Sequence, residues 1–180
     1  MIDKKALRAR MRADRDGFAS RGCAPIGADA RFTDRLTGGQ VIASYAPLGS
    51  EADPAPLAQA ARLAGCRLAL PEVIDRATPL RFRAWDGVAT LAQGPFGLRV
   101  PQPDWPEVVP DVILTPLLAF DARLNRLGQG AGHYDRAFET FPAAWRVGVA
   151  WSMQRVAALV ADPWDVPLHV IITENDWWTR

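Results

Sequence analysis

The segment Arg126-Leu-Gly-Gln-Gly-Ala-Gly-His-Tyr-Asp135 places glycines at positions 128, 130 and 132 between an arginine and a His-Tyr-Asp cluster. Glycine lacks a Cβ atom, so alternating glycines let backbone N–H groups approach a ligand closely. Successive N–H groups in such a turn form an anion-binding concavity, and a helix that starts behind it adds its positive end. Arg126 can donate two hydrogen bonds to phosphate oxygens, and Asp135 can bind a divalent cation. The segment therefore indicates a nucleotide-phosphate loop in front of a helix.

The spacing of this loop differs from the two commonest phosphate loops. A Walker loop ends in Gly-Lys-Ser or Gly-Lys-Thr, whereas Gly132 is followed by His133 and Tyr134. The dinucleotide pattern G-x-G-x-x-G fails because His133 occupies the position of its third glycine. A glycine-rich turn that only joins a strand to a helix is the alternative, and three glycines alone do not decide between the two. The flanking Arg, Tyr and Asp favour the phosphate loop.

Short apolar runs alternate with helical patterns along the rest of the chain. Strands are expected at residues 41–46, 67–70, 80–85, 111–115, 117–120, 146–151 and 169–173. Helices are expected at residues 2–18, 29–36, 53–64, 134–141 and 154–160, and residues 86–110, with many Pro and Gly, are expected to form loops over the sheet. This alternation predicts an α/β fold with a largely parallel sheet, and the length predicts a single domain of residues 1–180.

Composition restricts the functional classes. The formal net charge of +1 at pH 7 gives no global electrostatic reason to expect a nucleic acid or an anionic membrane as partner. Basic residues concentrate only in the first helix, so a nucleic-acid-binding module is the weakest alternative. No apolar run approaches the roughly 20 residues of a membrane span, and two cysteines are too few for a disulfide framework. We expect a cytoplasmic protein that acts as a monomer.

Three parts of the chain lie just after predicted strands. They are Glu51, the glycine loop (residues 128–132) and Trp151-Ser152. The carboxyl ends of parallel strands lie at one edge of a sheet, and ligands of α/β proteins bind outside that edge. The chain order therefore predicts that these residues share one rim.

The first helix has Ile2, Leu7, Met11 and Phe18 near one face.

The chain resembles the 5-formyltetrahydrofolate cyclo-ligase family, also called methenyltetrahydrofolate synthetase, over nearly its whole length. The resemblance rests on Lys4-x-x-Leu7-Arg8, a strand and turn that carry Glu51, Pro101-Gln-Pro103, residues 116–135, and the ending Gln154…Asp165…Val170-Ile-Ile-Thr-Glu174. It implies a three-layer α/β/α sandwich. It also implies an enzyme that closes the formyl group of 5-formyltetrahydrofolate onto N10, giving 5,10-methenyltetrahydrofolate at the expense of ATP with Mg²⁺.

The resemblance also implies roles for individual residues. Lys4, Arg8 and Arg126 are expected to meet the ATP phosphates and to act in catalysis. The expected ATP loop continues through Leu127, Gly128, Gln129, Gly130, Ala131, Gly132, His133 and Tyr134. The expected folate contacts are Ala46, Glu51, Gln129, Gly130, Ala131, Gly132 and His133. Asp135 and Asp165 are the expected magnesium carboxylates.

Each of these residues also has a purely structural interpretation. Lys4 and Arg8 can be solvated charges on one helix face, and Glu51 can be a helix-entry charge. Asp135 can be a first-turn residue favoured by the helix dipole, and Asp165 an ordinary loop aspartate. The chain departs from the family pattern at Leu124, His133, Trp164 and His169. A non-catalytic folate- or nucleotide-binding paralogue is therefore the alternative to an enzyme.

Overall fold

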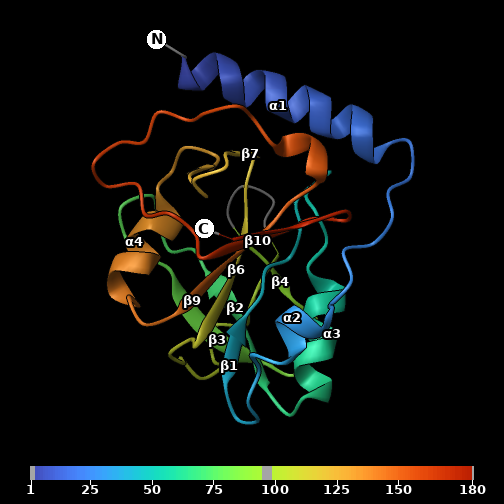
Figure 1. Ribbon diagram of the computed structural model, residues 1–180. Coiled ribbons are helices and arrows are strands. Elements are labelled where there is room, and N and C mark those ends of the chain that lie inside the picture. The colour runs from blue at the N-terminus through green and yellow to red at the C-terminus, as the bar shows by residue number, and fades with distance from the viewer. Residues whose placement is uncertain (1–2, 95–98, 180) are drawn as a thin grey trace.

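A seven-stranded sheet forms the centre of the computed structural model, which describes residues 3–94 and 99–179 (Figure 1). The strand order is β11-β10-β9-β6-β1-β2-β3. The inner strands are parallel: β10 (Val170–Ile172), β9 (Trp145–Val149), β6 (Val112–Pro116), β1 (Val41–Ala43) and β2 (Arg67–Glu72). The edge strands β11 (Trp177–Thr179) and β3 (Arg81–Trp85) are antiparallel to their neighbours. The predicted α/β fold with a largely parallel sheet is confirmed.

Helices cover both faces of this sheet. On one face, Phe32 of α2 (Ala30–Thr33) and Leu57 of α3 (Ala55–Leu63) share an apolar cluster with Leu114. On the other face, Phe138 of α4 (His133–Thr140) shares a cluster with Ile113. Successive residues of a strand point to opposite faces, so Ile113 and Leu114 of β6 contribute to different clusters. The result is the expected three-layer α/β/α sandwich.

Helix α1 (Lys4–Ala19) lies across one end of the sandwich (Figure 1). It begins where the Asp3 carboxylate accepts a hydrogen bond from the Lys5 backbone N–H at 2.8 Å. Leu7 and Met11 of α1 pack against a small cluster that includes Leu118 and Leu127. These residues follow strand β6, so α1 covers the carboxyl edge of the sheet. Ile2, which the sequence analysis placed near one face of this helix, lies outside the described residues.

The predicted helix at residues 154–160 is wrong. The structure has only a 3₁₀ turn, η2 (Ser152–Gln154), and Arg155 is extended with φ −71° and ψ 130°. The backbone N–H of Val156 donates to Phe120 O at 2.8 Å, and that of Leu159 donates to the Asp121 carboxylate at 3.0 Å. The N–H of Leu159 would serve the helix ladder, but the segment uses both donors to bind a neighbouring loop. Tertiary hydrogen bonds therefore override the helical pattern.

Short strands outside the main sheet form two further pairs. Strands β7 (Ala119–Phe120) and β8 (Arg126–Leu127) pair with each other, so the predicted strand at 117–120 is shorter than expected. Strands β4 (Ala92–Gln93) and β5 (Arg99–Val100) pair within the segment expected to be loops, of which residues 95–98 lie outside the described part. None of the helices in the described ranges is both long and apolar enough to cross a membrane.

Candidate active site

A cavity of about 690 Å³ opens at the carboxyl ends of β1, β2 and β6. Tyr45 and Ala46, which follow β1, line it together with Pro71 of β2 and Pro116 of β6. The chain passes from β1 to β2 on one side, whereas β6 and β9 lie on the other side of β1. In doubly wound sheets, ligands bind in the crevice where the strand order reverses in this way. The cavity therefore lies where the fold favours a ligand.

Every residue to which the sequence analysis assigned a ligand or a catalytic role lines this cavity, whereas Trp151 and Ser152, expected on the same rim, are not among its lining residues. The residues with an assigned role are Lys4, Arg8, Ala46, Glu51, Arg126, Leu127, Gly128, Gln129, Gly130, Ala131, Gly132, His133, Tyr134, Asp135 and Asp165. The structure thus brings together α1, the turn after β1, the glycine loop and a segment near the C-terminus. The contacts of these residues with ligands remain predictions.

The cavity also has lining residues that the sequence did not indicate as site residues. They are Tyr45, Leu48, Pro71, Val73, Arg76, Leu80, Arg99, Val100, Pro116, Asp162 and Trp164. Tyr45, Pro71 and Pro116 had a usable signal, because each lies at or just beyond the end of a predicted strand. Arg99 had none, because it lies in the segment expected to be loops.

The glycine loop requires glycine at two positions. Gly130 has φ +104° and Gly132 has φ +70°. Residues other than glycine rarely adopt these backbone angles. The Arg8 Nε donates to the Gly128 carbonyl at 3.0 Å, and a Cβ atom at Gly130 would lie 3.3 Å from the Arg8 Cζ. Helix α4 begins at His133 directly after the loop, so its positive end borders the cavity. The loop has the backbone form expected of an anion-binding turn.

The guanidinium of Arg126 is held on three sides. Its Nη2 donates to Asp135 Oδ1 at 2.8 Å, its Nη1 donates to Val166 O at 2.7 Å, and its Cζ lies 4.7 Å from the centre of the Phe138 ring. Burial lowers the pKa of Arg126 from its ordinary value, although Asp135 opposes this shift. Each terminal nitrogen has two hydrogens, so each keeps one hydrogen for a ligand. Arg126 is thus a fixed cation at the cavity wall.

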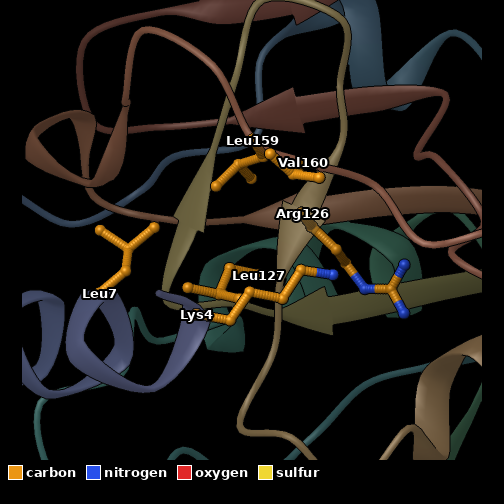
Figure 2. A pocket seen from close by; sticks show the side chains of 6 residues that line it. All are labelled: Lys4, Leu7, Arg126, Leu127, Leu159 and Val160. Atoms are coloured by element: carbon orange, nitrogen blue, oxygen red, sulfur yellow. The ribbon is translucent and has the colours of Figure 1, made fainter. Parts of the chain in front are cut away.

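Lys4 joins α1 to the segment around residue 165. Its Nζ donates to Asp162 Oδ2 at 2.6 Å and to Asp165 Oδ2 at 3.1 Å. Burial lowers the pKa of Lys4, but the bonds to the two carboxylates outweigh it and raise the pKa above its ordinary value. Figure 2 shows Lys4 extending toward Arg126 beside a second, much smaller pocket, of about 10 Å³, which Leu7 and Leu159 also line. Lys4 and Arg126 therefore both line the large cavity, and both line the small pocket beside it.

The carboxylates of Asp135 and Asp165 are suitable ligands for a hard divalent cation that takes its other ligands from water and a phosphate. One oxygen of each is engaged, since Asp135 Oδ1 accepts from Arg126 and Asp165 Oδ2 accepts from Lys4 and the Asp162 N–H. Within residues 3–94 and 99–179, no group of three or more His, Cys, Asp or Glu side chains could hold a metal ion. Magnesium commonly takes one or two carboxylates plus water and substrate phosphates. The residues present therefore fit magnesium that arrives with a nucleotide.

Glu51 is nearly buried, with 8% of its side chain exposed, and its carboxylate borders the cavity. Its Oε2 accepts from the Leu48 N–H at 3.0 Å, and its Oε1 accepts from Gln129 Nε2 at 3.3 Å. The Oε1 of Gln129 in turn accepts from Arg12 Nη2 at 2.7 Å. Gln129 thus connects the glycine loop to both Glu51 and helix α1.

His133 presents a buried ring nitrogen near the cavity. Its Nδ1 has no hydrogen-bond partner among the described residues. Burial lowers the pKa of His133 below its ordinary 6.5, and the nearby Arg136 and Arg76 lower it further. The imidazole is therefore neutral at pH 7, and one of its nitrogens accepts hydrogen bonds.

One residue of the turn before Arg126 has the left-handed backbone conformation, and this residue is a leucine. Leu124 has φ +61° and is fully buried. The Asp121 carboxylate, 1% exposed, accepts hydrogen bonds from the backbone N–H groups of Arg123, Asn125 and Leu159. Burial raises the pKa of Asp121, but these donors outweigh it and hold the pKa below its ordinary value. The departure at Leu124 therefore leaves an ordered turn in front of Arg126.

Comparisons with known proteins agree on one family. Residues 2–174 match the 5-formyltetrahydrofolate cyclo-ligase family. The chain is 32% identical over 144 residues to the 5-formyltetrahydrofolate cyclo-ligase of Escherichia coli K12, covering 76% of this chain and 79% of that protein. It is 34% identical over 144 residues to the one from Mycolicibacterium smegmatis, covering 75% and 74%. The structure of Aquifex aeolicus 5,10-methenyltetrahydrofolate synthetase is similar with a TM-score of 0.74 at 28% identity, covering 98% of this chain and 92% of that one.

Proposed function

This chain belongs to the 5-formyltetrahydrofolate cyclo-ligase family and is a ligase, and we propose that it converts 5-formyltetrahydrofolate and ATP to 5,10-methenyltetrahydrofolate, ADP and phosphate. One observation supports the proposal above the others. A single cavity holds the glycine loop, the cations Lys4, Arg8 and Arg126, and the carboxylate of Glu51. A nucleotide and a folate can therefore meet in one space.

The chemistry explains why such a site needs cations more than a protein nucleophile. The formyl oxygen of the substrate is a poor leaving group. It attacks the γ-phosphorus of ATP, ADP departs, and the oxygen becomes part of a phosphate ester. N10 then attacks the formyl carbon and loses its proton, and the C–O bond breaks to release phosphate and the methenyl cation. Phosphoryl transfer depends mainly on positioning and on neutralising charge.

In this proposal the phosphates lie at the glycine loop. Backbone N–H groups of the loop, the first turn of α4 and the side chains of Lys4, Arg8 and Arg126 stabilise the charge that develops on the transferred group. Asp135 and Asp165 would hold Mg²⁺, which supplies further charge neutralisation when it is bound with ATP. Lys4 and Asp165 contact each other, so in this proposal ligand binding exchanges this internal pair for contacts with phosphate and cation.

The folate lies on the opposite side of the glycine loop. The carboxylate of Glu51 accepts hydrogen bonds from adjacent N–H groups of the pterin ring, and Ala46 and residues 129–133 border the ring. Tyr45 contributes to the same wall: its hydroxyl donates to Ala52 O at 2.5 Å, which fixes the ring beside Glu51.

The test is an assay of purified protein with 5-formyltetrahydrofolate, ATP and Mg²⁺, in which absorbance reports the methenyl product. Each component is omitted in turn. We expect product only in the complete mixture. Folate and ATP binding without product would contradict the proposal and favour the non-catalytic binder. That alternative is suggested by the departures from the family pattern at His133 and Trp164.

A further inference from the structure

Helix α1 buries a charged side chain on the same face as its apolar residues. Its buried residues are Leu7, Met11 and Arg15, spaced by four, so they lie on one face. Only 6% of the Arg15 side chain is exposed. Burial of a guanidinium is unfavourable unless partners compensate for the lost water. An apolar side chain would pack this helix equally well, as Leu7 and Met11 do, so the charge at position 15 calls for another reason.

The contacts of Arg15 lead to one place, the turn that carries Glu51. Its Nε donates to Ser50 Oγ at 3.0 Å, and its Nη1 lies 3.8 Å from Glu51 Oε1. The same turn is fixed from the other side by Trp151, whose Nε1 donates to Ser50 O at 3.0 Å. Glu51 borders the cavity and Arg15 does not, so Arg15 stands directly behind Glu51.

Arg15 and Glu51 form an ion pair without a hydrogen bond between them. The Arg15 Nη1 is buried and has no hydrogen-bond partner among the described residues. Burial lowers the pKa of Arg15 from its ordinary value, although Glu51 opposes the shift. A guanidinium held close to a carboxylate without a hydrogen bond stabilises the negative charge. The two Glu51 oxygens already accept from Leu48 and Gln129, and each keeps a lone pair for a further donor.

We propose that Arg15 is a positioning residue for substrate binding, which holds the Glu51 carboxylate oriented toward the pterin ring. The inference rests on the proposed function, because it takes the folate as the ligand of Glu51. A pterin presents an amine and a ring N–H side by side, and an ionised carboxylate accepts from both. When the ligand fills the cavity and excludes water, Arg15 remains as the cation that compensates Glu51.

The test compares kinetic constants of Arg15→Met, Glu51→Gln and the double variant. Loss of one charge-assisted interaction predicts a folate KM raised about tenfold in Arg15→Met. The ATP KM and kcat should stay within about twofold, because Arg15 is remote from the phosphates in this account. In the Glu51→Gln background the same substitution should change the folate KM less than about twofold, since Arg15 acts through Glu51. Arg15→Lys should recover most of the loss.

Arg10→Met is the matched control. Arg10 lies on the same helix, and its exposed side chain has Asp14 4.0 Å away. Its loss should leave the folate KM unchanged, which separates the charge of the helix from the position of Arg15. Thermal unfolding of each variant shows whether α1 stays in place. If Arg15→Met fails to fold, Arg15→Gln, which can still donate to Ser50, provides the same comparison.

Two results would overturn the inference. The first is a wild-type folate KM in a folded Arg15→Met protein. The second is a loss that is equal in the presence and absence of Glu51, which would make Arg15 a packing residue. Failure of the proposed function looks different, because the wild-type protein itself would then form no methenyl product. In that case the variants are compared by their dissociation constants for 5-formyltetrahydrofolate. Failure of the wild-type protein to bind this compound would contradict both the proposed function and the inference about Arg15.

Discussion

Lys4 and Asp165 are 161 positions apart in the chain, yet Nζ and Oδ2 lie 3.1 Å from each other. With the 2.6 Å contact to Asp162, this pair fastens the first turn of α1 to the segment that borders the cavity near the C-terminus. Both ends of the chain therefore contribute charged groups to one wall, and these charges pair with each other. In the proposed function, a nucleotide exchanges these contacts for its own.

Removal of the Lys4 charge should weaken the use of ATP. In Lys4→Met we expect kcat/KM for ATP to fall about 10²-fold, the size typical of one lost donor to a developing charge. The folate KM should change little. Lys5→Met, at an exposed neighbouring position, is the control. Steady-state kinetics with ATP as the varied substrate provide the measurement, and wild-type values in Lys4→Met would remove this residue from the phosphate site.

The assignment of Asp165 to magnesium predicts a change in metal dependence. Asp165→Asn should raise the Mg²⁺ concentration for half-maximal activity at least about tenfold, because a neutral amide is a poorer ligand for a hard cation. Asp162→Asn also loses a contact with Lys4, but it should keep the wild-type Mg²⁺ dependence. Equal Mg²⁺ curves for wild type and Asp165→Asn would show that Asp165 only binds Lys4.

The left-handed conformation of Gly130 predicts that a side chain there disturbs the loop. Gly130→Ala should strain the backbone by about 1–2 kcal/mol and press on Arg8, raising the ATP KM. Gly17→Ala is the matched control, because Gly17 is exposed in α1 and a Cβ atom there meets nothing within 4 Å. It should increase the free energy of unfolding by about 0.5–1 kcal/mol. An unaltered ATP KM in Gly130→Ala would mean that the phosphates lie elsewhere.

The partly buried imidazole of His133 predicts a pH dependence of stability. Its pKa is lowered by burial and by Arg136 and Arg76, so the folded protein binds a proton less readily than the unfolded chain. The stabilising contribution is complete above pH 6.5, and it is lost as the pH falls through 6.5 toward the lower pKa of the folded state. Urea titrations from about pH 7.5 to about pH 5.5 should show a steeper loss of stability for wild type than for His133→Gln. Parallel curves would show that His133 titrates alike in both states.

The buried carboxylate of Asp121 should stabilise the turn before Arg126. Asp121→Asn places an amide N–H₂ group among backbone N–H donors, so we expect a loss of about 2–4 kcal/mol in the free energy of unfolding. Asp104→Asn, at an exposed position, should change it by less than about 0.5 kcal/mol. Denaturant titration measures both, and a wild-type midpoint for Asp121→Asn would contradict the role of these hydrogen bonds.

The sequence predicted the layers of the fold because its apolar runs are long and distinct. The run from Val112 to Thr115 is buried throughout, as a central parallel strand requires. The helix expected at residues 154–160 failed because Asp121 and Phe120 accept its N–H groups, and no local pattern encodes a partner so distant in the chain. Pairing of β7 with β8 was missed for a different reason, since two-residue strands leave no periodic signal.

The candidate site likewise combines residues that the sequence could predict with residues that it could not. The glycine loop was predictable because its spacing requires special backbone angles, which Gly130 and Gly132 have. Arg15 was not, because a basic residue within a basic helix looks solvated until the structure shows it buried against Glu51. Asp162 was missed likewise, since only the fold brings it to Lys4.

The most direct measurement counts phosphate and methenyl product in one reaction of purified protein with 5-formyltetrahydrofolate, ATP and Mg²⁺. Activation of the formyl oxygen by phosphorylation predicts one phosphate released for each methenyl group formed, and neither product without the other. Phosphate released with no methenyl absorbance would contradict the account, because the glycine loop would then serve a different acceptor.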